Sequence, residues 1–552
     1  MDVPEHNNFI NVGKEETAIG KHQSLDPNTY LSLDGNSLNT ADLVRLGKGL
    51  FNIKLTCEAE GKVNEAREVI ETIIKENRVV YGVNTGFGKF AHTLIPKDKL
   101  MELQANLIRS HSAGVGPPLS VERTRMLLAK GYSGVSMETV QAMVKAFNDL
   151  SLYSPSLSWV PEKGTVGATG DLDPLAHLTL GLMGEGRMWS PQRGWDHAKT
   201  VGYWCHGVTP LVLKPKEGVG LINGTQMMSS LAAEAVERAV GVARQADIIA
   251  ALSLEALWGT TKAFHSDIYA VRPHLGQIEV ALRRRSPLHS DVFPSQISDN
   301  HRTCDRVQDA YTLRCIPQVH GVANDTIAFV KIILSTELNS ATDNPLVFAE
   351  QGETISGGNF HGEYPAKALD YLAIGVHELA SMSESRTERL VNPSLSELPA
   401  FLVQDGALNS GFMIAHCTAA ALVSESKALC HQSSVDSLST SAVTEDHVSM
   451  GGWAARKALR VVEYVEQVLA IELLAACQAL EFLRPLKSTT PLEKVHELVR
   501  SVVRPWDHDC QMSPDIEAAH MLLREEKVWE AVRPYMDQYR DRLGLKPLPL
   551  DD

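Results

Sequence analysis

The chain has 552 residues, of which 44% are hydrophobic and 22% are charged, and its formal net charge at pH 7 is −15. This composition is typical of a globular protein with a large core, and the acidic balance disfavours nucleic acid or an anionic membrane as a partner. The eight cysteines are scattered and form no Cys-x-x-Cys pair, which disfavours a zinc site or a disulfide framework. We expect a cytoplasmic protein without a metal, a membrane span or a nucleic-acid partner.

The N-terminal part of the chain is predicted to combine short elements with glycine-rich loops. Residues 1–24 are polar and aperiodic, so we expect a disordered tail there. Asn39-Thr-Ala-Asp42 is a capping pattern and predicts a helix that begins next to it. Glycine-rich segments at residues 81–88 and 164–170 lie within residues 25–220, which we expect to form an N-terminal active-site region, because loops on a rigid scaffold commonly carry function.

Long helical patterns dominate the chain after residue 220. The spacing of apolar residues predicts five long helices, over residues 225–257, 318–339, 366–390, 411–430 and 453–483. Residues 470–483 are apolar on almost every face, which indicates a helix buried on several sides. We therefore predict a mainly α fold with a long central helical bundle over residues 221–485, a C-terminal helical region over residues 486–552 and a loop-rich active-site end. Helix faces this apolar also predict an obligate oligomer.

One glycine-rich segment carries a specific chemical signature. Its sequence, Gly164-Thr-Val-Gly-Ala-Thr-Gly-Asp-Leu-Asp-Pro-Leu-Ala-His177, resembles the segment of the aromatic amino acid ammonia-lyases in which Ala-Ser-Gly cyclises to a methylidene-imidazolone. The resemblance implies that Ala168, Thr169 and Gly170 form this electrophilic group, with the nitrogen of Gly170 attacking the carbonyl carbon of Ala168. Only a residue without Cβ fits so tight a turn. Because Thr169 stands where the family has Ser, an ethylidene form is expected.

Further segments match the same family in chain order. They are residues 81–88, 221–226, 308–320, 342–345, 357–361 and 444–448, and the resemblance extends from about Leu31 to Tyr535. A single match of this kind is weak evidence for the family, whereas six further matches in the same chain order are specific to it. The resemblance implies the helical-bundle fold that these enzymes share with fumarase-like lyases. It also implies a homotetramer whose active sites are shared between chains, and no metal or nucleotide cofactor.

The resemblance also assigns roles to individual residues. Tyr81, on its glycine-rich loop, is implied to be the base that removes the weakly acidic Cβ proton of the substrate. Arg314 and Asn344 are implied to bind the substrate carboxylate, because a guanidinium offers a planar fork of donors. The other implied contacts are Tyr311 between the amine and the electrophilic ring, Asn223 and Gln308 beside that ring, and Phe360 as a wall of the site.

Two positions indicate the substrate. His111 and Glu445 match the histidine branch of the family, whereas relatives that handle phenylalanine or tyrosine carry Leu and Gln there. An imidazole and a carboxylate can bond both nitrogens of a substrate imidazole, but a phenyl ring would leave them unpaired. The predicted reaction is the non-oxidative elimination of ammonia from L-histidine to give trans-urocanate. Two alternatives stay open: a catalytically impaired paralogue that acts as a structural or regulatory subunit, and a phenylalanine or tyrosine ammonia-lyase.

The chain departs from the family pattern at several points. Asp173 stands where relatives have Ala, which places a second carboxylate near Asp171 and the electrophile. Residues 126–133 are shorter than in relatives by about two helical turns, and residues 153–159 are partly inserted. The pairs His377-Glu378 and His496-Glu497 lack the second histidine of a zinc motif, and we expect both pairs on solvated helix faces.

Overall fold

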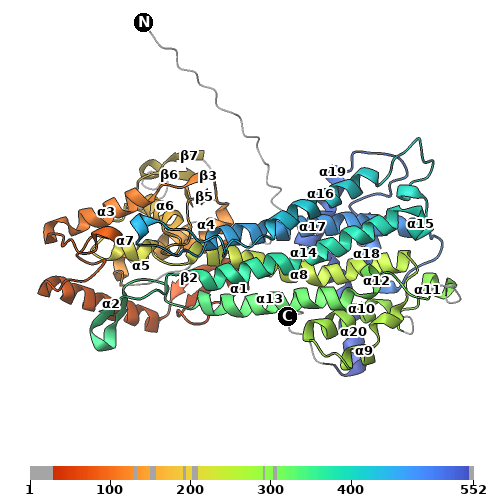
Figure 1. Cartoon of the computed structure of the whole chain (residues 1–552), viewed down its shortest axis with the longest axis horizontal. Coiled ribbons are helices and arrows are strands. Elements are labelled where there is room, and N and C mark those ends of the chain that lie inside the picture. Colours follow the sequence, from red (N-terminus) through yellow and green to blue (C-terminus); the bar gives the residue numbers. More distant parts are fainter. Residues whose placement is uncertain are drawn as a thin grey trace, which may run out of the picture.

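The computed structural model describes residues 29–128, 134–149, 157–190, 194–201, 209–289, 292–301 and 307–545. The predicted disordered tail over residues 1–24 lies outside the described residues, as do parts of the two segments of altered length at 126–133 and 153–159. The described part is elongated, with long helices along its length and shorter elements gathered at both ends (Figure 1).

Five long helices form the centre of the molecule. They are α8 (Gln226–Ala256), α13 (Ile316–Leu338), α14 (Glu363–Val391), α16 (Met413–Leu429) and α17 (Gly451–Glu481). Each agrees with a helix predicted from apolar spacing to within a few residues, so the predicted central bundle is confirmed. α17 packs against α8, α14 and α16, and α14 also packs against α13, which gives a continuous core.

The middle of the bundle is apolar apart from paired charges. Every residue of α17 from Val468 to Leu480 is buried. Within this run, Glu472 accepts two hydrogen bonds from the fully buried guanidinium of Arg386, at 2.6 and 2.8 Å. A buried carboxylate is tolerated when it is paired, and this bidentate contact explains a charge in the apolar run. No helix in the described part is long and apolar enough to cross a membrane.

The shorter N-terminal elements gather at one end of the bundle (Figure 1). The helices are α1 (Thr40–Gly47), α2 (Cys57–Glu76), α3 (Leu100–His111), α4 (Val121–Leu128), α5 (Met137–Asp149), α6 (Leu172–Leu182) and α7 (Glu217–Ile222). The strands are β1 (Tyr30–Leu33), β2 (Asn52–Leu55), β3 (Val115–Pro118), β4 (Leu157–Ser158), β5 (Pro161–Lys163), β6 (Arg187–Ser190) and β7 (Gly194–His197). β1 pairs with β2 in parallel, whereas the β3–β5 and β4–β6–β7 pairings are antiparallel. The capping prediction is confirmed, because the Asn39 side chain accepts from the N–H of Asp42 before α1.

The remaining elements connect or cover the long helices. The helices are α9 (Ser266–Ala270), α10 (Leu275–Leu288), α11 (Gln296–Asn300), α12 (Tyr311–Arg314), α15 (Pro393–Ser396), α18 (Thr490–Arg500), α19 (Ser513–Arg524) and α20 (Lys527–Leu543). They lie toward the end of the bundle opposite the N-terminal elements (Figure 1). Between α13 and α14, β8 (Leu346–Phe348) and β9 (Glu353–Ile355) form an antiparallel hairpin, and β8 lies beside α2.

The long helices do not all run in the same direction. A Cβ added to Gly362, just before α14, or to Gly451, at the start of α17, would overlap the sulfur of Met228 in the first turn of α8. These three helices therefore begin side by side. α13 runs the opposite way, because Thr225 before α8 hydrogen-bonds Glu337 near the end of α13. The N-termini of three parallel helices are thus gathered at the end that carries the glycine-rich loops.

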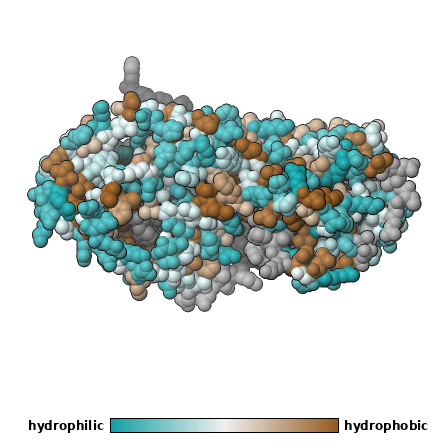
Figure 2. Space-filling view, turned by 60° about the horizontal axis from the view of Figure 1, so that its bottom comes forward, coloured by the Kyte–Doolittle hydropathy of each residue, from teal (hydrophilic) through white to brown (hydrophobic). Residues whose placement is uncertain are grey.

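Large apolar side chains are exposed on the outer face of α13 and α14. Phe329 and Tyr371 are each 46% exposed, with their ring centroids 6.2 Å apart, and Ile332 is 67% exposed. Figure 2 shows hydrophobic patches midway along one face of the molecule, between hydrophilic areas. Exposed apolar surface of this kind is typical of an area that another protein chain covers.

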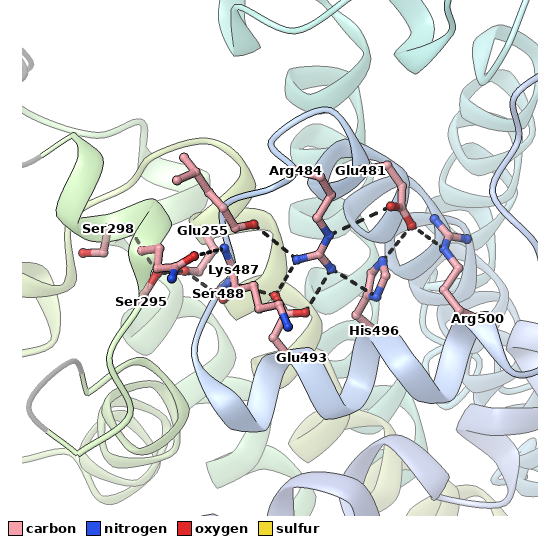
Figure 3. A network of polar contacts seen from close by, with 12 residues as sticks. Glu255, Ser295, Ser298, Glu481, Arg484, Lys487, Ser488, Glu493, His496 and Arg500 are labelled. Carbon is pink, nitrogen blue, oxygen red and sulfur yellow. Dashed lines mark hydrogen bonds and ion pairs between the residues drawn. The ribbon is translucent and has the colours of Figure 1, made fainter.

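A polar network ties α17 to α18 at the end opposite the glycine-rich loops (Figure 3). Arg484 binds both carboxylate oxygens of Glu493, at 2.8 and 2.9 Å. Glu481 accepts from His496 Nε2 and Arg500 Nε at 2.8 Å each, and these hydrogen bonds lower the pKa of Glu481 to about 2.

The two histidines expected on solvated helix faces are buried, so that expectation is wrong for both. His496 binds Glu481 between two helices, and His377 Nδ1 on α14 lies 3.1 Å from the hydroxyl of Ser426 on α16. Each histidine thus satisfies a polar group at a helix contact, while the neighbouring Glu378 and Glu497 are exposed. Among the residues that the structure describes, no group of side chains is arranged to hold a metal ion.

Candidate active site

The loop before α6 carries residues 168–170 and is anchored to the start of α17. The backbone N–H of Met450 donates to the carbonyl of Val166 at 2.8 Å, and the Ser449 hydroxyl donates to the carbonyl of Gly167 at 3.0 Å. Gly167 has a φ of +67°, and a Cβ there would overlap the Ser449 hydroxyl. Glycine therefore allows the loop to approach α17 this closely.

The other side of the tripeptide meets the start of α8. The N–H of Asp171 donates to the carbonyl of Gly224 at 2.6 Å, and the N–H of Gly224 lies 3.4 Å from the carbonyl of Thr169. Gly170 has a φ of +72°, and a Cβ there would overlap the Gly224 carbonyl. The turn around Gly170 is therefore too crowded for any other residue, as the cyclisation chemistry requires.

Three helix N-termini converge on the tripeptide. α6 begins at Leu172, directly after it, while α8 and α17 begin next to the segments that bind it. The aligned peptide dipoles of each helix place partial positive charge at its N-terminus. Asp171 accepts the N–H of Met228 at 2.8 Å, which satisfies one of the free donors of α8. The partial positive charge of three helix N-termini therefore lies close to the tripeptide, together with the carboxylate of Asp171.

Glu445 contacts the tripeptide directly. The hydroxyl of Thr169 donates to Glu445 Oε1 at 2.9 Å, which brings together two side chains 276 residues apart in the sequence. The other carboxylate oxygen, Oε2, accepts from the Thr440 hydroxyl at 2.8 Å. Backbone hydrogen bonds between residues 440 and 445 close this loop, so the carboxylate is held in place by its own segment.

Asn223 is buried next to the tripeptide and is 2% exposed. Its Nδ2 donates to Asp343 Oδ1 at 3.1 Å and to the carbonyl of Asn344 at 3.3 Å. Asp343 also forms a buried ion pair with Lys216 at 2.6 Å, which fixes its position. Asn223 Oδ1 has no hydrogen-bond partner in the described part of the chain. This oxygen is therefore available to a donor on a bound molecule.

Asn344 and Phe360 lie at the same end of the molecule. Asn344 Oδ1 accepts the N–H of Gly357 at 2.9 Å, which links the two segments that contain them. The ring of His361, next to Phe360, stacks on the ring of His447 with centroids 5.8 Å apart. The segment that holds Phe360 is therefore adjacent to the loop that holds the Glu445 carboxylate.

Tyr81 is carried on a glycine-rich loop beside these segments. Its ring packs edge-on against Phe87 at 6.2 Å between centroids, and its hydroxyl is 3.5 Å from the N–H of Gly88. A Cβ on Gly88 would lie 3.2 Å from the Ser441 hydroxyl, so the Tyr81 loop touches the loop that carries Glu445.

His111 is the last residue of α3, which packs against α6 and α7. Its Nδ1 is 2.8 Å from the carbonyl of Leu107; because a carbonyl can only accept, Nδ1 carries the proton and Nε2 remains as an acceptor. Asp173, on α6, accepts the N–H of Ala113 at 2.8 Å just beyond the end of α3. Burial raises the pKa of Asp173.

Gln308, Tyr311 and Arg314 lie at the opposite end of the bundle. Asp309 binds the backbone of the loop that follows α8, whereas Asn223 precedes the start of α8. With 31 residues in α8, the two groups are separated by about 45 Å within one chain. Figure 1 likewise shows α12 and α6 at opposite ends. One chain thus does not bring these three residues to the tripeptide.

In this distant group Gln308 and Tyr311 are open to solvent, whereas Arg314 is partly buried. Tyr311 is 71% exposed, and the guanidinium of Arg314 stacks on its ring at 4.9 Å from the centroid. Nε of Arg314 has no hydrogen-bond partner in the described part of the chain. A pocket of about 350 Å³ opens beside Tyr311, and Glu384 and Arg389 also line it. An exposed surface of this kind can contact a ligand or a residue of another chain.

The residues around the tripeptide fit a prosthetic group of the methylidene-imidazolone type. Gly170 occupies a turn that excludes any Cβ, and the Thr169 hydroxyl that would leave is already hydrogen-bonded to a carboxylate. Asn223 Oδ1 offers an unused acceptor next to the segment that would form the ring. Asn223 and the backbone of Gly224 are thus placed to hold such a group.

Some residues that build this site could not be singled out from the sequence. Ser449, Thr440 and Lys216 act through contacts between segments that are distant in the chain, and no motif identifies them. Asp171 and Asp343 lie within matched motifs, next to Gly170 and Asn344. Their place inside these motifs is the sequence signal that identifies them.

Comparison with known proteins places the chain in a family. Residues 38–501 match the family model described as aromatic amino acid lyase, and the chain belongs to this family. The histidine ammonia-lyase of Mus musculus is 72% identical over 522 residues, which cover 93% of this chain and 78% of the mouse protein. The histidine ammonia-lyase of Caenorhabditis elegans is 59% identical over 528 residues, which cover 94% of this chain and 77% of that protein.

Solved structures show the same fold. Histidine ammonia-lyase from Trypanosoma cruzi matches with a TM-score of 0.84 and 53% identity, covering 92% of this chain and 96% of that chain. Tyrosine aminomutase from Streptomyces globisporus matches with a TM-score of 0.83 and 34% identity, covering 92% of this chain and 99% of that chain. The predicted family and the predicted mainly α fold are confirmed.

Proposed function

We propose that the protein eliminates ammonia from L-histidine and releases trans-urocanate. The observation that carries this proposal is the carboxylate of Glu445, fixed 2.9 Å from the Thr169 hydroxyl. An anion at this position suits a substrate ring with N–H donors and is left unpaired by a phenyl ring. The similarity to histidine ammonia-lyases from animals, at 72% and 59% identity, supports this reaction over a phenylalanine or tyrosine ammonia-lyase and over an impaired paralogue.

Residues 168–170 form the prosthetic group, in an ethylidene form because position 169 is Thr. Once formed, this group supplies an electrophile to which the substrate amine adds, so that nitrogen becomes a leaving group. The family match supports a self-formed group, and the crowded turn at Gly170 and the unused Oδ1 of Asn223 fit it.

The other site residues bind the substrate and move its proton. Tyr81 takes the Cβ proton after its loop closes and excludes water. His111, through Nε2, and Glu445, through its carboxylate, each accept one hydrogen bond from the substrate ring in its imidazolium form, which carries an N–H on both nitrogens. The remaining contacts are Arg314 and Asn344 at the substrate carboxylate, Tyr311 between amine and ring, Asn223 and Gln308 beside the ring, and Phe360 against the substrate.

A complete site requires more than one chain. Residues 308–314 lie about 45 Å from the tripeptide of their own chain, a distance set by the 31 residues of α8, so another subunit supplies them. The exposed apolar face of α13 and α14 offers surface for self-association. We take the assembly to be a homotetramer with shared active sites.

Location and organisation belong to the same proposal. The six cysteines in the described part are free thiols, which suits a reducing cytoplasm. Residues 25–220 act as the active-site region, residues 221–485 as the central bundle and residues 486–552 as a C-terminal helical region.

The direct test is product formation from purified protein. With L-histidine, ammonia and trans-urocanate are expected in equal amounts, with a kcat/KM at least about 100-fold above that for phenylalanine or tyrosine. A higher kcat/KM for phenylalanine or tyrosine would favour the corresponding lyase. No product from any of the three would overturn the proposal and favour an impaired paralogue.

A further inference from the structure

The hydroxyl of Thr169, which the proposed prosthetic group must lose, is in direct contact with the carboxyl group of Glu445. Thr169 Oγ1 and Glu445 Oε1 are 2.9 Å apart, and the Thr440 hydroxyl holds Oε2 at 2.8 Å. Formation of the group must remove this same Thr169 hydroxyl. The carboxyl therefore touches a reacting atom at a stage when no substrate can yet be processed.

We propose that Glu445 is the catalytic acid that expels the Thr169 hydroxyl while the prosthetic group forms. This inference rests on the proposed function, in which residues 168–170 become the electrophile. Hydroxide is a poor leaving group, so its departure needs a proton donor within hydrogen-bond reach of the oxygen. The acid form of Glu445 provides one, and its Oε2 contact to Thr440 keeps Oε1 directed at the leaving oxygen.

The atoms balance in two steps. In the first, the nitrogen of Gly170 bonds to the carbonyl carbon of Ala168, and the Ala168 oxygen leaves as water with the amide protons of Gly170 and Thr169. In the second, the Cα proton of Thr169 passes to a water molecule, and its electron pair forms the Cα=Cβ bond as the Cβ–Oγ1 bond breaks. Glu445 gives its proton to Oγ1, which leaves as water, and the hydronium ion formed in the same step returns a proton to the carboxylate.

The surroundings assist the second step. Loss of the Cα proton pushes negative charge onto the carbonyl oxygen of Thr169, which lies 3.4 Å from the N–H of Gly224, just before the start of α8. When the hydroxyl has left, Glu445 Oε1 has lost its partner on the tripeptide. The same oxygen is then free for the substrate imidazole, so one carboxyl serves first in formation of the site and then in recognition.

Intact mass of the purified full-length protein tests this role independently of turnover. The wild type is expected to have lost two waters, and Glu445→Gln only one, because its ring closes but keeps the hydroxyl. Glu378→Gln, the same substitution at an exposed carboxylate on α14, is the matched control and is expected to lose two waters. A Glu445→Gln protein that loses two waters as completely as the wild type would overturn the inference. Loss of no water by this variant would also overturn it, because Glu445 would then act at ring closure.

A second variant covers the case in which Glu445→Gln does not fold. Glu445→Ala leaves space for formate, a small carboxylic acid, and the second water is expected to be lost only when formate is supplied. The same mass with and without formate would contradict the role of Glu445. If the wild type itself has lost no water, the proposed prosthetic group fails and this inference fails with it. Two waters lost by both wild type and variant leave the proposed function intact and reject the role of Glu445 alone.

Discussion

At position 169 a single methyl group separates this chain from the serine of the family pattern. In the proposed prosthetic group this methyl would lie on the carbon that accepts the substrate amine, so it would hinder a bond made on the way to the transition state. Thr169→Ser is expected to raise kcat roughly tenfold with little change in KM, which steady-state urocanate formation measures. Thr169→Ala is expected to lower kcat by at least about a thousandfold, because no hydroxyl remains to leave. Equal activity of wild type and Thr169→Ala would show that the electrophile is not used.

The acceptor nitrogen of His111 gives a prediction about specificity. His111→Leu removes the Nε2 acceptor and is expected to lower kcat/KM for histidine by roughly 10- to 100-fold, because a substrate N–H is left unpaired. His111→Gln, which keeps an acceptor at the end of the side chain, is the matched control and is expected to lose less. Competition between histidine and phenylalanine measures the change. An unaltered preference in His111→Leu would rule out this contact.

Asp173 gives a prediction about stability and pH. Burial raises its pKa above 3.8, so the ionised form is disfavoured in the folded protein. For an acid with a raised pKa, this cost is present above the folded pKa and disappears at low pH. Asp173→Asn keeps the acceptor for the Ala113 N–H and cannot ionise, so we expect a higher thermal unfolding midpoint than wild type at neutral pH. Calorimetry over a pH series should show the difference shrinking toward the acid side; a constant difference would exclude ionisation as its cause.

At the scale of elements, the long helices were predictable and the loop contacts were not. Apolar spacing located α8, α13, α14, α16 and α17, because a helix buried on most faces carries its own signal. The contact of Glu445 with Thr169 depends on how loops meet at the ends of these helices, and local sequence does not encode that. The buried position of His496 is not evident from local sequence for a related reason: its partner, Glu481, lies on a different helix.

The junction of α17 and α18 gives a second prediction about pH. Hydrogen bonds from His496 and Arg500 lower the pKa of Glu481 from 4.5 to about 2, so its ionised form stabilises the folded protein at neutral pH. Because the folded pKa is depressed, this stability is present above pH 4.5 and is lost as the pH falls toward about 2. Glu481→Gln is expected to lower the thermal unfolding midpoint at neutral pH, and the deficit should shrink in acid. Glu497→Gln, at an exposed carboxylate paired with Lys494, is the control and should change little.

At the scale of the whole molecule, the sequence and the single chain give different pictures of the site. Motif order groups Arg314 and Tyr311 with the tripeptide, whereas the fold separates them by the length of α8. Sequence alone could not show this, because helix direction and length decide which end each motif reaches. The separation, the unused Nε of Arg314 and the exposed face of α13 and α14 are all accounted for by a site shared between subunits.

Complementation between two inactive variants tests this account most directly. Thr169→Ala would remove the proposed electrophile at one end of the chain, and Arg314→Ala would remove the proposed carboxylate contact at the other. Each is expected to be nearly inactive on L-histidine alone. Co-expressed chains mix within oligomers, and if each site draws these two residues from different subunits, random mixing restores about a quarter of the wild-type urocanate formation. Mixed oligomers that stay as inactive as either parent would contradict a histidine-eliminating site built from both ends of the chain.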